Sequence, residues 1–284
     1  MNKDRVVVAV EDLTYVYQPQ GVRALTDVDL TIRAGEFVGI VGQNGAGKTT
    51  LLKSLVGLLT PTQGRVLITD LDTRHMAVAD LATSIGLVLQ NPDQQLFAQS
   101  VEEEVAFGPR NLGLGRDQVK QRVDEAIGLT SLDAFRHEFP PALAKGDRAK
   151  VVIASVLAMH PQIVVFDEPT TGQDYRGCHQ IMQIAWKLHQ NGRTVIVVTH
   201  DVALIAEYTE RTVVLRGGEV LLDDTTEAVF AQPEVLHQSN VTPPQITQLA
   251  SSLPAALRLP SQALTVKQLG DAILARTLST RTHH

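Results

Sequence analysis

The sequence has little cysteine, no long apolar stretch and no excess of positive charge. Its single cysteine, Cys178, excludes a disulfide within the chain and is typical of a reducing compartment. No apolar run approaches the ~18 residues of a membrane-crossing helix. The net charge of −6 gives no basic field for nucleic acid. The nine histidines show no metal-site spacing with cysteine, and the N-terminus indicates a strand, not a signal peptide.

The composition is that of a soluble globular protein, with 44% hydrophobic and 20% charged residues. A chain of 284 residues can bury a substantial core, as one large domain or as one domain with a small appendage. The last two residues, His283 and His284, fit either a tag remnant or a native tail.

The most informative stretch runs from Gly42 to Thr50 and matches the phosphate-loop pattern G-x-x-x-x-G-K-[ST]. An apolar run over 37–41 precedes it as a predicted strand, and a helical pattern over 51–56 follows it. Glycines let the backbone N–H groups turn toward phosphate, and a helix N-terminus adds partial positive charge. We expect Lys48 to reach the β- and γ-phosphates of ATP and the Thr49 hydroxyl to face Mg²⁺.

Strand and helix patterns alternate through the rest of the chain. Strands are expected over 6–10, 12–17, 24–32, 65–69, 85–89, 163–166, 194–198, 212–215 and 219–222, and helices over 101–107, 116–129, 147–159, 177–189 and 266–274. The Gly108-Pro109 pair is expected to interrupt the helical stretch that begins at residue 101. The predicted fold class is α/β: a phosphate-loop ATPase core with a parallel sheet, an N-terminal antiparallel β subdomain, a helical subdomain inserted after Gln90 and a small C-terminal appendage.

Polar residues follow several of the buried strands, at the sheet edge where ligands gather in such folds. Asp167 is placed as a magnesium-associated acid, and the adjacent Glu168 is our candidate for orienting or deprotonating the attacking water. His200 is predicted to hydrogen-bond the γ-phosphate and that water. Gln90 is suited to ligate Mg²⁺ or to position water. Tyr17 is predicted to stack on adenine, with burial in a small β-core as the rival interpretation.

These predictions give a nucleotide site and a metal site. The expected nucleotide contacts are Tyr17, Gly42, Gln43, Asn44, Gly45, Ala46, Gly47, Lys48, Thr49, Thr50 and Gln90, and the expected metal ligands are Thr49, Gln90 and Asp167.

Taken together, the phosphate loop, Gln90, Asp167-Glu168, Asp174 and His200 resemble the ATP-binding subunit of an ABC transporter over about residues 5–225. The segments 90–97 and 101–109, with the Pro243-Pro244-Gln245 stretch, are similar to the energy-coupling factor (ECF) group, which imports vitamins and transition-metal ions. We therefore expect an ATP-binding domain over 1–225, with its helical subdomain at about 91–160, and a C-terminal interaction region over 226–284.

The resemblance implies a head-to-tail dimer with a second ABC ATPase subunit, identical or different, in which each ATP lies between one phosphate loop and the other subunit's signature motif. It also implies docking at the cytoplasmic face of the cell membrane on an integral T component, with a separate substrate-binding S component and no nucleic acid. This chain does not indicate the transported substrate, because the family assigns substrate binding to another subunit. The alternatives are a soluble ABC ATPase without a transporter and a regulatory nucleotide-binding half with little turnover.

The signature motif departs from the family pattern Leu-Ser-Gly-Gly-Gln. The aligned residues are Leu143, Ala144, Lys145, Gly146 and Asp147. Ala144 lacks the serine hydroxyl, and Asp147 brings a negative charge near phosphate, which is unfavourable unless Lys145 or Arg148 compensates. We expect this chain to have a competent site of its own but to offer its partner an altered one. The resemblance also places Asp174 in a loop that crosses the dimer interface.

Overall fold

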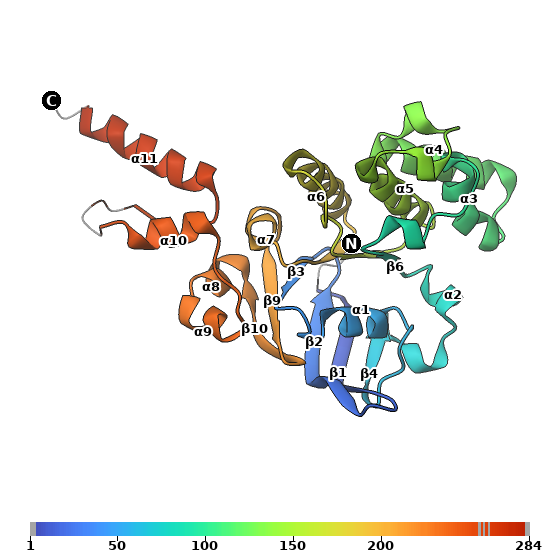
Figure 1. The fold of residues 1–284 in the computed structure, drawn as a ribbon, viewed down its shortest axis with the longest axis horizontal. Helices are drawn as coiled ribbons and strands as arrows, with labels where there is room; N and C mark the ends of the chain where they lie inside the picture. Colours follow the sequence, from blue (N-terminus) through green and yellow to red (C-terminus); the bar gives the residue numbers. More distant parts are fainter. Residues whose placement is uncertain (1–3, 255–256, 258, 261, 282–284) are drawn as a thin grey trace.

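The computed structural model describes residues 4–254, 257, 259–260 and 262–281, so His283 and His284 lie outside the described residues. Two sheets stack against each other, a helical lobe lies beyond one of them, and a pair of C-terminal helices projects from the body (Figure 1). The predicted α/β class with a parallel sheet and an antiparallel N-terminal sheet is confirmed.

The larger sheet has the strand order β10-β9-β3-β8-β7-β6. Its strands are β3 (Phe37–Val41), β6 (Ile85–Val88), β7 (Ile163–Asp167), β8 (Thr194–Val198), β9 (Arg211–Arg216) and β10 (Glu219–Thr225). All neighbours pair in parallel except β10, which pairs antiparallel to β9. Strands β3, β7 and β8 are buried along their whole length, as expected for parallel strands covered on both faces. Their C-terminal ends therefore meet at one edge.

The smaller sheet is antiparallel, in the order β2-β1-β4-β5. Its strands are β1 (Val6–Tyr17), β2 (Val22–Arg33), β4 (Gln63–Ile68) and β5 (Leu71–Asp72). The two strands expected over 6–10 and 12–17 are one strand with a register shift, where Asp12 adopts a φ of 50°. Helix α1 (Lys48–Leu55) shares one apolar cluster with both sheets, in which Leu52 packs with Leu30 and Ile40.

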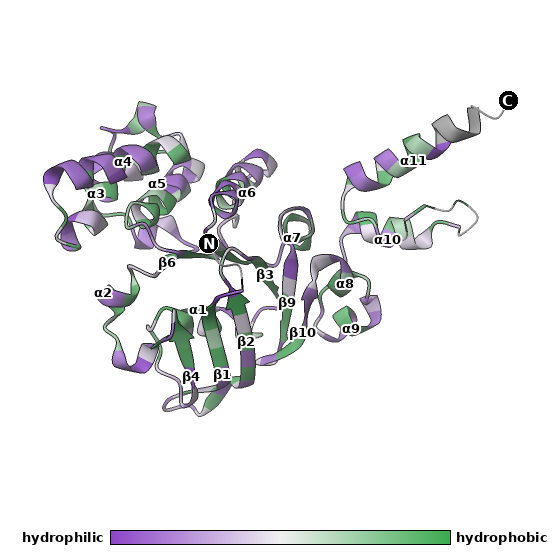
Figure 2. Ribbon diagram, turned by 180° about the vertical axis from the view of Figure 1, so that it is seen from behind, coloured by the Kyte–Doolittle hydropathy of each residue, from purple (hydrophilic) through white to green (hydrophobic). Residues whose placement is uncertain are grey.

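Helices cover the opposite face of the larger sheet. They are α3 (Val101–Asn111), α4 (Arg116–Thr130), α5 (Lys145–Leu157), α6 (Tyr175–Gln190) and α7 (Val202–Tyr208), while the short α2 (Val78–Leu81) lies before β6. Phe37, Val164 and Phe166 point to this side because side chains alternate along a strand. The sheet interior is largely green and the outer turns of α4 and α6 largely purple in Figure 2.

The predicted interruption at Gly108-Pro109 is wrong, because α3 continues to Asn111. Proline inside a helix removes one N–H donor and crowds the carbonyl four residues earlier, and burial of one face of α3, Pro109 included, offsets this cost. Gly108 is needed for packing, because a Cβ there would lie 2.6 Å from Cγ of Met159, two residues after the end of α5. The glycine thus lets α3 and α5 approach closely.

The C-terminal region has two parts. Helices α8 (Thr226–Phe230) and α9 (Pro233–Gln238) bury Phe230 and Leu236 in the main core. Helices α10 (Gln245–Ser252) and α11 (Val266–Arg281) instead share a small cluster of their own around Ala250, and they project from the body (Figure 1). No helix in the described part of the chain is both long and apolar enough to cross a membrane.

Candidate nucleotide-binding site

The loop from Gly42 to Gly47 connects β3 to α1 at the edge where the parallel strands end. Its glycines are required by space: a Cβ on Gly42 would lie 2.4 Å from the Leu215 carbonyl oxygen, and one on Gly47 would lie 2.6 Å from that of Ala24. Gly47 is the N-cap of α1 and offers no side chain to cap it. The first N–H groups of α1 are therefore directed at the loop, where an anion can accept from them.

The side chain of Lys48 is hydrogen-bonded to the backbone of the phosphate loop. Its side chain is buried, with 7% of the residue exposed, and Nζ donates to the carbonyl oxygens of Gly42 at 2.7 Å and Gln43 at 3.1 Å. Burial lowers the pKa of Lys48, while the negative charges of Glu168 and Asp167 act to raise it. The ammonium group thus lies among loop carbonyls that a bound phosphate could replace as acceptor.

A cavity of about 820 Å³ surrounds this loop. All eleven residues expected to contact the nucleotide line it, together with Glu168 and His200. Tyr17 is half-buried, and its hydroxyl lies 3.2 Å from Oγ1 of Thr50. Its ring packs edge-on against Tyr15 at 4.9 Å and also borders the cavity, so stacking on adenine stays a prediction.

A second cavity, of about 700 Å³, adjoins the first through Thr49, Gln90 and Thr171, which line both. Asp167 opens into this second cavity, whereas Glu168 opens into the first. The two acids therefore diverge, as expected for successive residues at a strand end. The three predicted metal ligands, Thr49, Gln90 and Asp167, share one cavity.

The residues at this second cavity fit a magnesium ion. Asp167 Oδ1 is buried and has no hydrogen-bond partner among the described residues. Burial, and then the negative charge of Glu168, raise the pKa of Asp167, while Lys48 and Lys53 oppose this shift. The donors available are carboxylate, hydroxyl and amide oxygens, the set that Mg²⁺ prefers. A cation there would relieve the like-charge repulsion.

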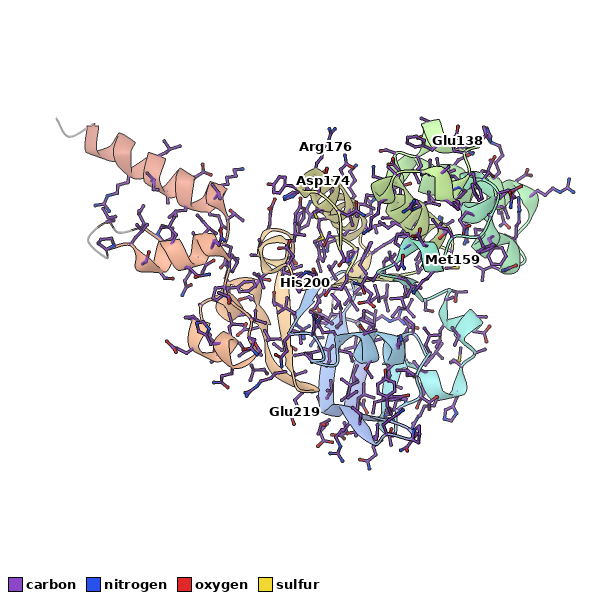
Figure 3. The ribbon with its side chains drawn as sticks, in the orientation of Figure 1. Glu138, Met159, Asp174, Arg176, His200 and Glu219 are labelled. Carbon is purple, nitrogen blue, oxygen red and sulfur yellow. The ribbon has the colours of Figure 1, made fainter. Side chains whose placement is uncertain are left out.

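Glu168 and His200 come together from the ends of β7 and β8. His200 Nδ1 lies 2.8 Å from Glu168 Oε2, and the His200 backbone N–H donates to the same oxygen at 3.4 Å. His200 remains mostly exposed, with 66% of its side chain accessible, and Figure 3 labels it at the centre of the molecule. Its second ring nitrogen is thus free to meet a ligand.

The signature residues form the first turn of α5 and its N-cap, away from the chain's own phosphate loop. Among them only Lys145 lines either cavity, the second one. The cation beside Asp147 is Lys150, at 3.2 Å, whereas Arg148, one of the two residues considered for that role, pairs with Asp93 at 3.1 Å. Asp147 and Lys150 are three residues apart on α5, so their side chains lie on the same face of the helix and can pair. Asp174 caps α6 by accepting from the N–H of Gly177 at 2.7 Å (Figure 3).

Several cavity residues were not expected from the sequence. They are Val22–Ala24, Val41, Thr171, Val202 and 240–242. The last group lies almost 200 residues from the phosphate loop and carries no chemical motif of its own. Local pattern offers no signal for such a contact, because only the packing of α9 against the core brings it about.

Comparisons with known proteins show the family of this chain. The family model described as "ABC transporter" matches residues 25–171. A putative ABC transporter ATP-binding protein of Caldanaerobacter subterraneus subsp. tengcongensis is 39% identical over 248 residues, covering 87% of this chain and 43% of that protein. The energy-coupling factor transporter ATP-binding protein EcfA of Methanocaldococcus jannaschii is 38% identical over 249 residues, covering 87% of this chain and 89% of that protein.

Solved structures give the same result. CbiO1 from Clostridium perfringens, described as part of the ABC transporter complex CbiONQ, superimposes with a TM-score of 0.76 at 35% identity, covering 87% of this chain and 99% of its own. The ATP-binding cassette MJ0796, solved as a dimer in a post-hydrolysis state with ADP and Pi, gives a TM-score of 0.70 at 30% identity, covering 77% and 98% of the two chains. This chain spans less than half the length of the first three curated relatives.

Proposed function

This chain belongs to the ATP-binding subunits of ABC transporters, and we propose that it hydrolyses ATP to drive an importer of the energy-coupling factor type. The observation that carries the proposal is the single cavity shared by the phosphate loop, Glu168 and His200. The cargo would be a vitamin or a transition-metal ion, held by a separate S component. The similarity to EcfA proteins and to CbiO1 supports the importer type.

In the proposed reaction the backbone N–H groups at the start of α1 and the Lys48 ammonium hold the triphosphate. Bound Mg²⁺, held by Thr49, Gln90 and Asp167, would neutralise charge on the phosphate oxygens. Glu168 accepts a hydrogen bond from the attacking water and takes its proton as the water attacks the γ-phosphorus. The bond from the γ-phosphorus to the bridging oxygen then breaks, and ADP and phosphate are the products. His200 holds Glu168 Oε2 through Nδ1 and presents Nε2 to the γ-phosphate.

A groove on the helical lobe supports docking on a membrane T component. It encloses about 350 Å³ between α2, α3 and α5, and Phe97 and Phe107 lie at its rim with 59% and 47% of their surfaces exposed. The two rings meet edge-to-face with centroids 4.7 Å apart. Glu104 is buried and accepts from the N–H groups of Phe97 and Ala98 at 2.9 and 2.8 Å, which holds the rim in place.

Such a rim of exposed aromatic rings around an apolar groove is typical of a site for a partner helix. The segment that carries Phe97 follows Gln90 directly, so movement at the nucleotide site can reach the groove along the chain. We infer a peripheral position at the cytoplasmic face of the membrane and a dimer with a second ATPase subunit, identical or different.

The altered signature favours one alternative, a regulatory half with little turnover at the partner's site. The observation in its favour is Ala144, which offers no hydroxyl. The pairing of Asp147 with Lys150 at 3.2 Å counts against it, because it compensates the negative charge. The geometry of Glu168 and His200 favours turnover at this chain's own site.

Affinity purification of the full chain from membranes, followed by identification of bound proteins, tests the proposal. We expect an integral membrane protein and a second ATPase chain, together with ATP turnover that is lost in Lys48→Ala. Lys120→Ala is the matched control, since Lys120 is exposed on α4 and its ion pair among the described residues is with Asp124. Recovery without a membrane partner would favour a soluble ABC ATPase, and an assembled complex without turnover would favour the regulatory half.

A further inference from the structure

The C-terminal region reaches back to the phosphate loop. Asn240 follows α9, and its Nδ2 donates to Oε1 of Gln43 at 2.7 Å across 197 residues of sequence. Asn240, Val241 and Thr242 also line the nucleotide cavity. One wall of the candidate site is thus supplied by a segment that follows the last strand, β10, in the sequence.

The turn that presents Asn240 is firmly held. On one side Ser239 is completely buried, and its hydroxyl donates to the Leu236 carbonyl at 2.8 Å. On the other side Val241 is 6% exposed and packs in the main core, and its N–H donates to the same carbonyl at 3.2 Å. Asn240 itself has a φ of 50°, a left-handed conformation that asparagine tolerates better than most residues. The exposed carboxamide therefore projects from a rigid base.

Gln43 is held at both ends by this arrangement. Its carbonyl oxygen accepts from Lys48 Nζ at 3.1 Å and from the N–H of Ala46 at 3.1 Å, while its side chain accepts from Asn240. Gln43 is exposed and would otherwise sample several side-chain conformations. Because Gln43 is the first residue after Gly42, ordering its side chain restricts the part of the loop that must receive phosphate.

We propose that Asn240 is a positioning residue for the phosphate loop, so that nucleotide affinity depends on the turn at 239–242. The inference rests on the proposed nucleotide function. Preordering a binding loop lowers the entropy cost of binding. By reciprocity, a nucleotide that favours the ordered loop must also stabilise the turn. The turn lies just before α10, so the projecting C-terminal helices are joined to the part of the chain that responds to nucleotide.

Binding of a fluorescent ATP analogue with Mg²⁺ to the full chain tests the proposal. Asn240→Gly permits the left-handed backbone and removes the side chain with its carboxamide, and the Ser131→Gly control makes the matching backbone change elsewhere. We expect about five-fold weaker binding, the effect of losing one ordinary hydrogen bond. Gln43→Ala should weaken binding similarly, and the double variant should be little worse than either single variant. Ser131→Gly is the matched control: it changes another left-handed residue (φ 58°), at the end of α4, and should leave affinity unchanged.

Hydrogen exchange distinguishes a positioning role of Asn240 from a merely structural one. In the unaltered chain the analogue should slow amide exchange at 239–242, and in Gln43→Ala this protection should shrink although the turn itself is intact. Equal affinity in Asn240→Gly, additive losses in the double variant, or no protection of the turn would each overturn the inference while leaving nucleotide binding standing. Failure of the unaltered chain to bind would overturn the proposed function as well.

Discussion

The imidazole of His200 and the carboxylate of Glu168 share a 2.8 Å hydrogen bond between Nδ1 and Oε2. Glu168 makes this contact from a left-handed backbone, with a φ of 47°, fixed by its own N–H donating to the Val198 carbonyl at 2.8 Å. A conformation that glutamate rarely adopts is retained where the surrounding structure demands it, and such residues concentrate at functional sites. The pair therefore acts as one unit.

The first prediction concerns this pair. Glu168→Gln should lower the hydrolysis rate about a thousand-fold, because the amide cannot take the proton from water, while ATP still binds. His200→Ala should lower the rate about a hundred-fold by releasing Oε2 and removing the phosphate contact. Steady-state ATPase assays with parallel binding measurements check both. His75→Ala, at an exposed histidine, should behave as the unaltered chain does, and normal turnover in Glu168→Gln would refute the assigned role.

The second prediction follows from the raised pKa of Asp167. Burial and the charge of Glu168 favour the protonated acid in the folded state. The folded pKa thus exceeds the unfolded one, so this group's stability contribution is complete below the unfolded pKa and is lost as pH rises through the folded pKa. Without Mg²⁺, Asp167→Asn should therefore raise the melting temperature at neutral pH.

The gain from Asp167→Asn should shrink in acid, as the carboxyl of the unaltered chain becomes protonated. Mg²⁺ should stabilise the unaltered chain more than the variant. Calorimetry across pH checks this, with Asp80→Asn on the exposed surface of α2 as the control. A lower melting temperature for Asp167→Asn at neutral pH would contradict the electrostatic argument.

The third prediction concerns the signature. Lys145→Gly combined with Asp147→Gln restores two positions of the family pattern and removes one charge of each sign. We expect it to raise ATP turnover in the assembled transporter, because the glycine and glutamine of the family pattern return at the partner's phosphate site. The structure adds a condition: Lys150 then loses its partner at 3.2 Å, so Lys150→Ala alone serves as the control for that loss. An unchanged turnover rate in the double variant would argue against any penalty from this motif.

The fourth prediction concerns the groove on the helical lobe. Phe97→Ser and Phe107→Ser should each reduce recovery of the membrane partner, because each removes apolar surface from a docking rim. ATP binding by the isolated chain should not change. Leu71→Ser alters another exposed apolar residue, on β5, which does not line the groove, and should leave recovery intact. Full recovery with both phenylalanines replaced would place the membrane partner elsewhere.

Local pattern was sufficient for the parallel strands and for the phosphate loop. Strands β3 and β8 end at the residues that their apolar runs predicted, because fully buried strands carry a continuous signal. The motif over 42–50 specifies backbone geometry directly through its glycines. Pattern was less reliable at α3. Pro109 predicted a break there, but the helix continues and packs against α5.

The sequence by itself determined the class of chemistry here, since the loop glycines, Lys48 and the two acids at the end of β7 need only the ends of parallel strands to be brought together. Only the tertiary structure decided which groups touch: Lys150 rather than Arg148 beside Asp147, and Asn240 against Gln43. The physical reason is that pairing between side chains depends on how helices and turns pack in space. Such packing joins residues that no spacing along the chain relates.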